Sequence, residues 1–190
     1  MTAKPLANLH KGGGPLDAIH PLYDRLVTWL YERQDVRRAL PIANRLERLL
    51  ARCHQKPANI FIEECRSLVG EAKGHLERAI KHRENEIRLI RRLHKISQGT
   101  ESEAYAFGQY DYDDLSERLD ILAMLNHGIG NLDKAVSTLL ESRRLCASHG
   151  ITFDGEALLR DYQEEKRALR KSLSSPRKNA ARARLRATGT

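Results

Sequence analysis

Apolar residues recur at every third or fourth position through most of this chain, in stretches interrupted by short segments rich in Gly, Pro, Asp and Gln. This spacing places the apolar side chains on one face of an α-helix. We find no convincing stretch in which apolar and polar residues alternate, which is the pattern of a half-buried β-strand. Aromatic residues make up only 5% of the 190 residues, which disfavours a β-sandwich or barrel. The sequence therefore predicts an all-α fold.

The interruptions divide the chain into about seven predicted helices, which cover approximately residues 16–33, 36–50, 60–72, 76–95, 114–126, 132–148 and 155–169. Asp35 is a suitable N-cap for the second helix, because its side chain accepts a hydrogen bond from a free backbone N–H. Gly74 and Gly150 are expected to end helices, as glycine commonly does. The short connections favour antiparallel helices packed in neighbouring pairs.

The charge divides the chain into a body and a tail. The formal net charge is +8, and residues 171–190 contain six of the 33 Lys and Arg residues but none of the 25 Asp and Glu residues. Because this segment also has few large apolar side chains, we predict a basic disordered tail. Residues 1–15, which include three consecutive glycines, are predicted to be a flexible segment. Residues 16–170 are predicted to form a single helical-repeat domain.

Three segments of the chain place a small residue near the start of a predicted helix. These small residues are Ala39, Ala79 and Ala135, which are 40 and 56 residues apart. A small side chain at this position lets two antiparallel helices approach closely. The pattern indicates a repeated helix–turn–helix unit of irregular length.

The third of these units resembles the tetratricopeptide repeat (TPR). The resemblance is carried by Leu119, Leu122, Ala123, Gly130, Asn131, Ala135, Leu139 and Leu145, whereas Asn126, Ser142 and Ala147 depart from the family pattern. It covers residues 114–149 most clearly and residues 20–96 more loosely. The resemblance implies a degenerate array of antiparallel helix hairpins, with a concave surface formed by the first helix of each pair. An irregular helical bundle is the alternative.

The sequence contains no recognised catalytic or metal-binding motif. The eight histidines form no HExxH pattern, and the glycines at 12–14 lack the Lys-Ser/Thr ending of a P-loop. Cys146 and His149 lie one helical turn apart, but no second pair of ligands accompanies them. The acidic run from Asp111 to Asp120 lacks the spacing and central glycine of an EF-hand. We therefore expect no enzyme, no metal and no cofactor, and the three widely spaced cysteines predict a cytoplasmic setting.

Two groups of residues are candidates for binding a partner. The TPR resemblance implies that Arg118 and Asn126 face a groove, and a cluster of aromatic residues precedes the same helix. The peptide-binding candidates are thus Tyr105, Phe107, Tyr110, Tyr112, Arg118 and Asn126. The aromatic cluster either packs back on the domain or inserts into a partner. A basic stretch of the fourth helix and the tail provide candidates for phosphate contacts, namely Arg83, Arg88, Arg91, Arg92, Lys95, Arg177, Lys178, Arg182, Arg184 and Arg186.

These patterns predict a non-catalytic scaffold or adaptor that binds a peptide or helix of a protein partner on a TPR-like surface. The alternative is a nucleic-acid- or ribosome-associated helical protein that uses the basic residues of the fourth helix and the tail. Neither a membrane span nor a signal peptide is expected, because no sufficiently long apolar stretch occurs. Leu158, Leu159 and Leu169 of the seventh helix leave open a surface for self-association into a homo-oligomer.

Overall fold

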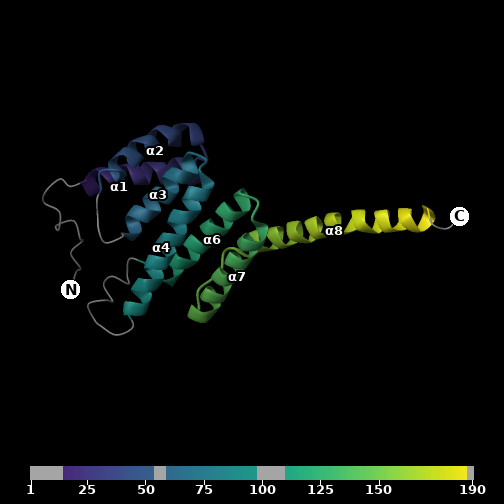
Figure 1. Ribbon diagram of the computed structural model, residues 1–190. Coiled ribbons are helices and arrows are strands. Elements are labelled where there is room, and N and C mark those ends of the chain that lie inside the picture. Colours follow the sequence, from purple (N-terminus) through teal and green to yellow (C-terminus); the bar gives the residue numbers. More distant parts are fainter. Residues whose placement is uncertain (1–14, 54–58, 98–109, 188–190) are drawn as a thin grey trace. The chain divides into compact units, whose positions relative to one another are not determined.

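The computed structural model describes residues 15–53, 59–97 and 110–187, and these residues form seven α-helices and one π-helical segment (Figure 1). No β-strand occurs among the described residues. The predicted all-α fold is therefore confirmed. The chain divides into two compact units, an N-terminal unit, Met1–Gly108, and a C-terminal unit, Gln109–Thr190. A single domain over residues 16–170 stays a prediction.

The N-terminal unit contains α1 (Pro15–Val27), the π-helical segment η2 (Thr28–Glu32), α2 (Val36–Leu50), α3 (Ile60–Ala72) and α4 (Leu76–Ser97). As expected, Asp35 caps α2, and its side chain accepts a hydrogen bond from the backbone N–H of Arg38 (3.1 Å). Asn59 caps α3 in the same way. Gly74 connects α3 to α4 in a left-handed conformation (φ 71°) that favours glycine. The helices pack in neighbouring pairs, α1 on α2, α2 on α3 and α3 on α4.

The apolar core of this unit is built from one face each of α1, α2 and α3. Its largest fully buried side chains include Ile19, Leu26, Leu46 and Leu68. Helices α3 and α4 approach closely at Gly70, where a Cβ atom would lie 3.0 Å from the Cβ and from the backbone nitrogen of Ala79. Ala79 is one of the three small residues of the repeated pattern, so its small size serves this helix contact.

The C-terminal unit contains α6 (Tyr112–Gly128), α7 (Leu132–His149) and α8 (Glu156–Ala187). Asp111 and Asp114 form a capping box at the start of α6, and Asn131 caps α7. Gly150 ends α7 in the left-handed conformation (φ 68°), as the sequence predicts. Helix α7 packs on both α6 and α8.

The core of the C-terminal unit surrounds two buried alanines, Ala123 of α6 and Ala135 of α7. Ala135 is one of the three predicted close-approach positions, and Ala123 is one of the residues that carry the TPR resemblance. Both belong to a buried apolar cluster with Leu132, Val136, Leu139, Leu159 and Tyr162. Lys166 of α8 forms an ion pair with Asp133 of α7, which ties the two helices together at their surface.

Helix α8 continues through residues 171–187, in contrast to the predicted disordered tail. Residues 177–187 are rich in Ala and Arg, which have high helix propensity, whereas Pro176 and the serines before it do not favour a helix interior. The predicted flexible segment, residues 1–15, lies outside the described residues except for Pro15. No helix of the described residues is long and apolar enough to cross a membrane.

Candidate binding site

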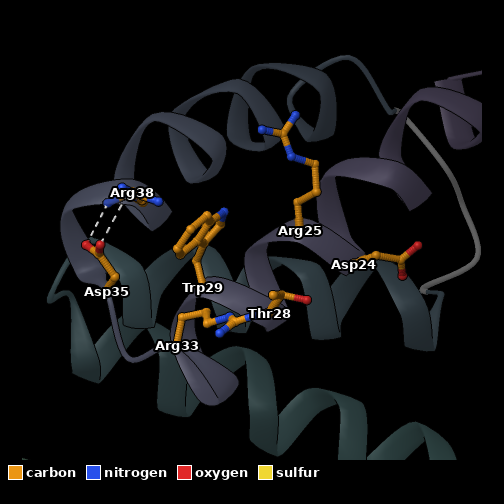
Figure 2. A pocket seen from close by; sticks show the side chains of 7 residues that line it. All are labelled: Asp24, Arg25, Thr28, Trp29, Arg33, Asp35 and Arg38. Atoms are coloured by element: carbon orange, nitrogen blue, oxygen red, sulfur yellow. Dashed lines mark hydrogen bonds and ion pairs between the residues drawn. The ribbon is translucent and has the colours of Figure 1, made fainter.

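An open cleft of about 710 Å³ lies between α1, η2 and the start of α2. It is lined by Asp24, Arg25, Thr28, Trp29, Arg33, Asp35 and Arg38. Figure 2 shows Asp24 and Arg25 at one end of the cleft, Asp35 and Arg38 at the other, and Trp29 between them. Trp29 is the single tryptophan of the chain, and its indole is half-buried. The cleft thus combines charged side chains with a large apolar surface in its middle.

The local backbone that forms the cleft departs from a regular helix. The N–H of Arg33 donates to the carbonyl of Thr28 (2.9 Å), and the N–H of Asp35 donates to the carbonyl of Trp29 (2.8 Å). The Arg33 bond spans five residues, the pattern of the π-segment η2, which often occurs at functional sites. The Asp35 bond spans six residues and closes the end of that segment. Gln34 then adopts a left-handed conformation (φ 50°) that is uncommon for a residue with a side chain.

Three arginines and two aspartates give the cleft an excess of positive charge. Arg38 is already engaged, because its Nε lies 3.5 Å from Asp35 Oδ2 and its guanidinium carbon lies 4.8 Å from the Trp29 ring centre. By contrast, the guanidinium groups of Arg25 and Arg33 form no hydrogen bond or ion pair within the described part of the chain. Both side chains are exposed. They are therefore available to bind carboxylate or phosphate groups.

Helix α2 carries further exposed arginines, and of these only Arg38 lines the cleft. Its exposed arginines, with that of the turn that follows, are Arg37, Arg38, Arg45, Arg48 and Arg52. Glu47 is the only acidic residue of α2, and it is bound by Lys73 (2.7 Å) and Arg78 (3.2 Å). The hydrogen bond from Lys73 lowers the pKa of Glu47. Two apolar residues beside the arginines are also exposed, Val36 (55%) and Leu40 (40%).

Arg83 does not belong to a basic surface, contrary to the prediction for α4. Its side chain is only 1% exposed, and Nη1 binds Glu86 Oε2 (2.7 Å) while Nη2 lies 3.5 Å from Glu71 Oε1. Tyr31 donates a hydrogen bond to the other oxygen of Glu71 (2.6 Å). Burial lowers the pKa of a guanidinium, but the carboxylates of Glu86 and Glu71 outweigh it and raise the pKa of Arg83. The arginine holds α4 to α3 from inside the unit.

The other predicted basic residues of α4 do lie on its surface. Arg88, Arg91, Arg92 and Lys95 are all exposed. Arg88 and Arg92 line a hollow of about 330 Å³ together with Glu63, Asn85 and Leu89, and Arg88 donates a hydrogen bond to Asn85. The predicted tail residues Arg177, Lys178, Arg182, Arg184 and Arg186 belong to the helical backbone of α8, but their side chains lie outside the described part.

Glu63 is a buried acidic residue at the contact between α3 and α4. It accepts hydrogen bonds from Arg66 (2.7 Å) and Asn85 (3.0 Å), and its Oε2 lies 2.8 Å from His82 Nδ1. Burial by itself raises the pKa of Glu63, but these hydrogen bonds outweigh burial and the pKa is lowered. The residue thus stabilises the fold in its charged form.

Asn126 and Arg118 are not exposed groove residues, contrary to the prediction. Asn126 is only 3% exposed, and its Nδ2 donates to the carbonyl of Leu122 (2.8 Å). Arg118 is also buried, and its Nη1 lies 3.2 Å from Asp114 Oδ1. The reason is that α6 buries residues around most of its circumference. Residues outside its main apolar stripe, such as Arg118 and Asn126, are therefore also buried. The two residues are structural parts of α6.

The aromatic candidates are only partly described. Tyr112 lies in the first turn of α6 and stacks on His149 at the end of α7, with ring centres 3.5 Å apart. Tyr110 lies near the guanidinium of Arg118, with 5.8 Å between the ring centre and the guanidinium carbon. These two aromatic residues therefore pack against their own unit. Tyr105 and Phe107 lie outside the described residues.

An acidic hollow of about 300 Å³ lies at the start of α6. Its lining includes Asp111, Asp113, Asp114, Glu117, Asp120 and Asp154. Burial raises the pKa of Asp120, and its Oδ1 has no hydrogen-bond partner in the described part of the chain. No group of three or more His, Cys, Asp or Glu residues that would suit a metal ion occurs among the described residues. Cys146 contacts Ser116 Oγ through its sulfur (3.0 Å) and is buried.

None of the seven cleft residues is among those that the sequence patterns single out for binding. Two signals in the sequence point to the region, namely the single tryptophan and the density of arginine between residues 25 and 52. Neither signal reveals a cleft, because its shape depends on the π-helical turn and on the packing of α2 against α1. Comparisons with protein-family models, with curated protein sequences and with solved structures find no significant match to this chain.

Proposed function

We propose that this chain is a non-catalytic interaction module that binds a segment of another polypeptide, on a degenerate TPR-like arrangement of helix pairs. The observation that carries the proposal is the open cleft of the N-terminal unit, in which Trp29 lies among exposed arginines. Tryptophan and arginine are the residue types that most often dominate the energetics of protein interfaces. We therefore propose the cleft of α1, η2 and the start of α2 as the binding surface, in place of Arg118 and Asn126.

The shape of the cleft favours a polypeptide segment over a small substrate. An enzyme site is normally a deep apolar pocket with a few converging polar groups, whereas this cleft is open and lined mainly by charged side chains. The exposed Val36 and Leu40 on the adjacent surface of α2 add apolar area beside the charges. A mixed surface of this kind is typical of interfaces between proteins.

Capture of partner proteins by the immobilised full-length chain tests this proposal. A cleft variant, Trp29→Ala with Arg33→Gln, is compared with the wild type and with Arg45→Gln, which removes an exposed charge of α2 outside the cleft. We expect specific proteins to be retained by the wild type and by Arg45→Gln but lost from the cleft variant, and binding to be reproduced with the purified partner. Equal capture by all three chains would refute the cleft as the binding surface.

A nucleic-acid-binding role is the second candidate, and it has its own supporting observation. Arg88, Arg91, Arg92 and Lys95 form an exposed basic surface on α4, and residues 170–187 of α8 contain no acidic residue. Binding through phosphates depends strongly on salt. If only nucleic acid is captured, and if high salt or a truncation after Leu169 abolishes the capture, this second candidate replaces the first.

A further inference from the structure

The two unengaged arginines of the cleft define the kind of segment that it accepts. Arg25 and Arg33 are exposed, line the same cleft and form no ion pair within the described residues. We propose that the cleft binds an extended acidic segment of a partner protein with the pattern acidic–x–apolar–x–acidic. This inference rests on the proposed function, because it specifies the polypeptide that the cleft receives.

The pattern follows from the spacing of the cleft residues along the helix. Arg25, Trp29 and Arg33 are separated by four residues each. A four-residue step advances by about 6 Å in an α-helix, and the wider turns of η2 make the second step shorter. In an extended peptide, side chains on one side recur every second residue, at intervals of about 6.6 Å. Because arginine side chains are long enough to cover this difference, three alternate side chains of an extended segment can contact the three cleft residues in turn. The first and third meet an arginine, and the second meets the tryptophan.

The chemistry of each position follows from its partner. A guanidinium binds a carboxylate through two parallel N–H donors, which gives both attraction and orientation. Trp29 contributes a half-buried indole in the middle of the cleft, and an apolar side chain placed there is removed from water. Arg38 is held by Asp35 and lies over the Trp29 ring, so the apolar surface ends at Arg38.

The two aspartates of the cleft favour a peptide over a nucleic acid. Asp24 and Asp35 line the same cleft as the arginines, and a carboxylate repels a continuous row of phosphates. A peptide has backbone N–H groups between its acidic side chains, and these donate hydrogen bonds to a carboxylate. An alternating segment therefore satisfies both signs of charge in the cleft.

Synthetic peptides test the pattern directly, with the fluorescence of Trp29 in the full-length chain as the readout. The probe is acetyl-Ser-Glu-Ser-Leu-Ser-Glu-Ser-amide, which contains no tryptophan. We expect a Kd on the order of 100 µM, typical of a short flexible ligand. The same peptide with Gln in place of both Glu is expected to bind about tenfold more weakly. A peptide of equal composition with adjacent glutamates, acetyl-Ser-Glu-Glu-Leu-Ser-Ser-Ser-amide, is expected to bind more weakly than the probe.

Variants of the chain show which residues carry the binding. Arg25→Gln and Arg33→Gln are each expected to weaken the probe about two- to fivefold, a modest loss because both pairs are exposed to solvent. Arg45→Gln, the matched control on α2, is expected to change nothing. The double variant Arg25→Glu with Arg33→Glu is expected to prefer the corresponding peptide with Lys in place of Glu, and far-UV circular dichroism checks that each variant is folded.

Three results would overturn the inference: equal binding of the Glu and Gln peptides, equal binding of the two glutamate arrangements, or equal losses from Arg45→Gln and Arg33→Gln. An oligouridylate that binds more tightly than the probe and depends on Arg25 and Arg33 would also overturn it, in favour of nucleic acid. If the probe fails while the cleft variant still loses its captured protein partner, the acidic pattern is wrong and the proposed function stands. If the partner is captured regardless of the cleft variant, the proposed function itself fails.

Discussion

Replacing Arg83 with methionine is expected to destabilise the N-terminal unit by about 3–5 kcal/mol, the usual cost of removing one partner from a buried ion pair. The magnitude follows from the burial of both groups, since the Arg83 side chain is 1% exposed and that of Glu86 is fully buried. The substitution removes the positive charge that lies 2.7 Å from Glu86 and 3.5 Å from Glu71. Methionine replaces the aliphatic stem of the arginine, so loss of packing contributes little.

The single tryptophan makes this prediction simple to measure. Trp29 lies in the N-terminal unit, so its fluorescence during urea unfolding reports on that unit. The expected loss is a large part of the roughly 5–15 kcal/mol by which typical domains are stable. Arg88→Met, which removes an exposed arginine of the same helix, serves as the control and is expected to change the free energy of unfolding by less than about 0.5 kcal/mol.

A double variant separates the lost charge from other effects. Arg83→Met with Glu86→Leu removes both members of the pair and is expected to be more stable than Arg83→Met alone, because no buried carboxylate is left at position 86 without its guanidinium partner. The reasoning is refuted if Arg83→Met costs less than about 1 kcal/mol with an unchanged denaturant slope. It is also refuted if the double variant is the less stable of the two.

Further substitutions test the packing, the backbone and the ionised groups. Gly70→Ala is expected to cost about 1–3 kcal/mol in urea unfolding, because its Cβ would lie 3.0 Å from Ala79 backbone, whereas Gly74→Asn, where a Cβ meets no atom within 4 Å, serves as the milder comparison. Gln34→Gly is expected to stabilise the N-terminal unit by about 0.5–1 kcal/mol, because glycine adopts the left-handed conformation without strain; a loss of stability would show that the Gln34 side chain makes a larger contribution. Burial alone would raise the pKa of Glu63, but hydrogen bonds lower this pKa below its ordinary 4.5. The stabilising effect of the Glu63 carboxylate is therefore present above pH 4.5 and is lost as the pH falls through the lowered pKa. Glu63→Gln should flatten this acid-induced loss of stability. Burial raises the pKa of Asp120 above 3.8, so its charged form opposes folding at neutral pH. Asp120→Asn should raise the thermal stability measured by circular dichroism at neutral pH but not at pH well below 3.8. An equal effect of the substitution at both pH values would contradict the raised pKa of Asp120.

Most bounds of the helices, the C-terminal end of α8 excepted, could be predicted because the signals that set them are local. Asp35 caps α2 through the backbone N–H of a residue only three positions away, and Gly150 ends α7 through its own φ angle. The buried Ala79 and Ala135 could also be predicted, since a small residue at a helix crossing follows from the apolar pattern around it. Such features depend on neighbours within a few residues, which the sequence displays directly.

The candidate site could not be predicted in the same way. Trp29 and the arginines around it are visible in the sequence, but the cleft depends on a π-helical turn and on the placement of α2 beside α1. Asn126 was predicted to be an exposed binding residue, but it is buried. A polar residue at the edge of an apolar stripe is covered when its helix is buried on more than one side. Neither the shape of the cleft nor the burial of Asn126 can be predicted from the apolar periodicity of a single helix.

The sequence by itself determined the all-α class, the order of the helices and most of their ends, because helix formation and capping are short-range effects. Only the tertiary structure decided which charged residues are structural and which are free to bind. Arg83 and Arg88 lie five residues apart on α4. Arg83 is buried against Glu71 and Glu86, whereas Arg88 is exposed. The cost of burying a charge depends on partners from other helices, and these partners come together only when the helices pack.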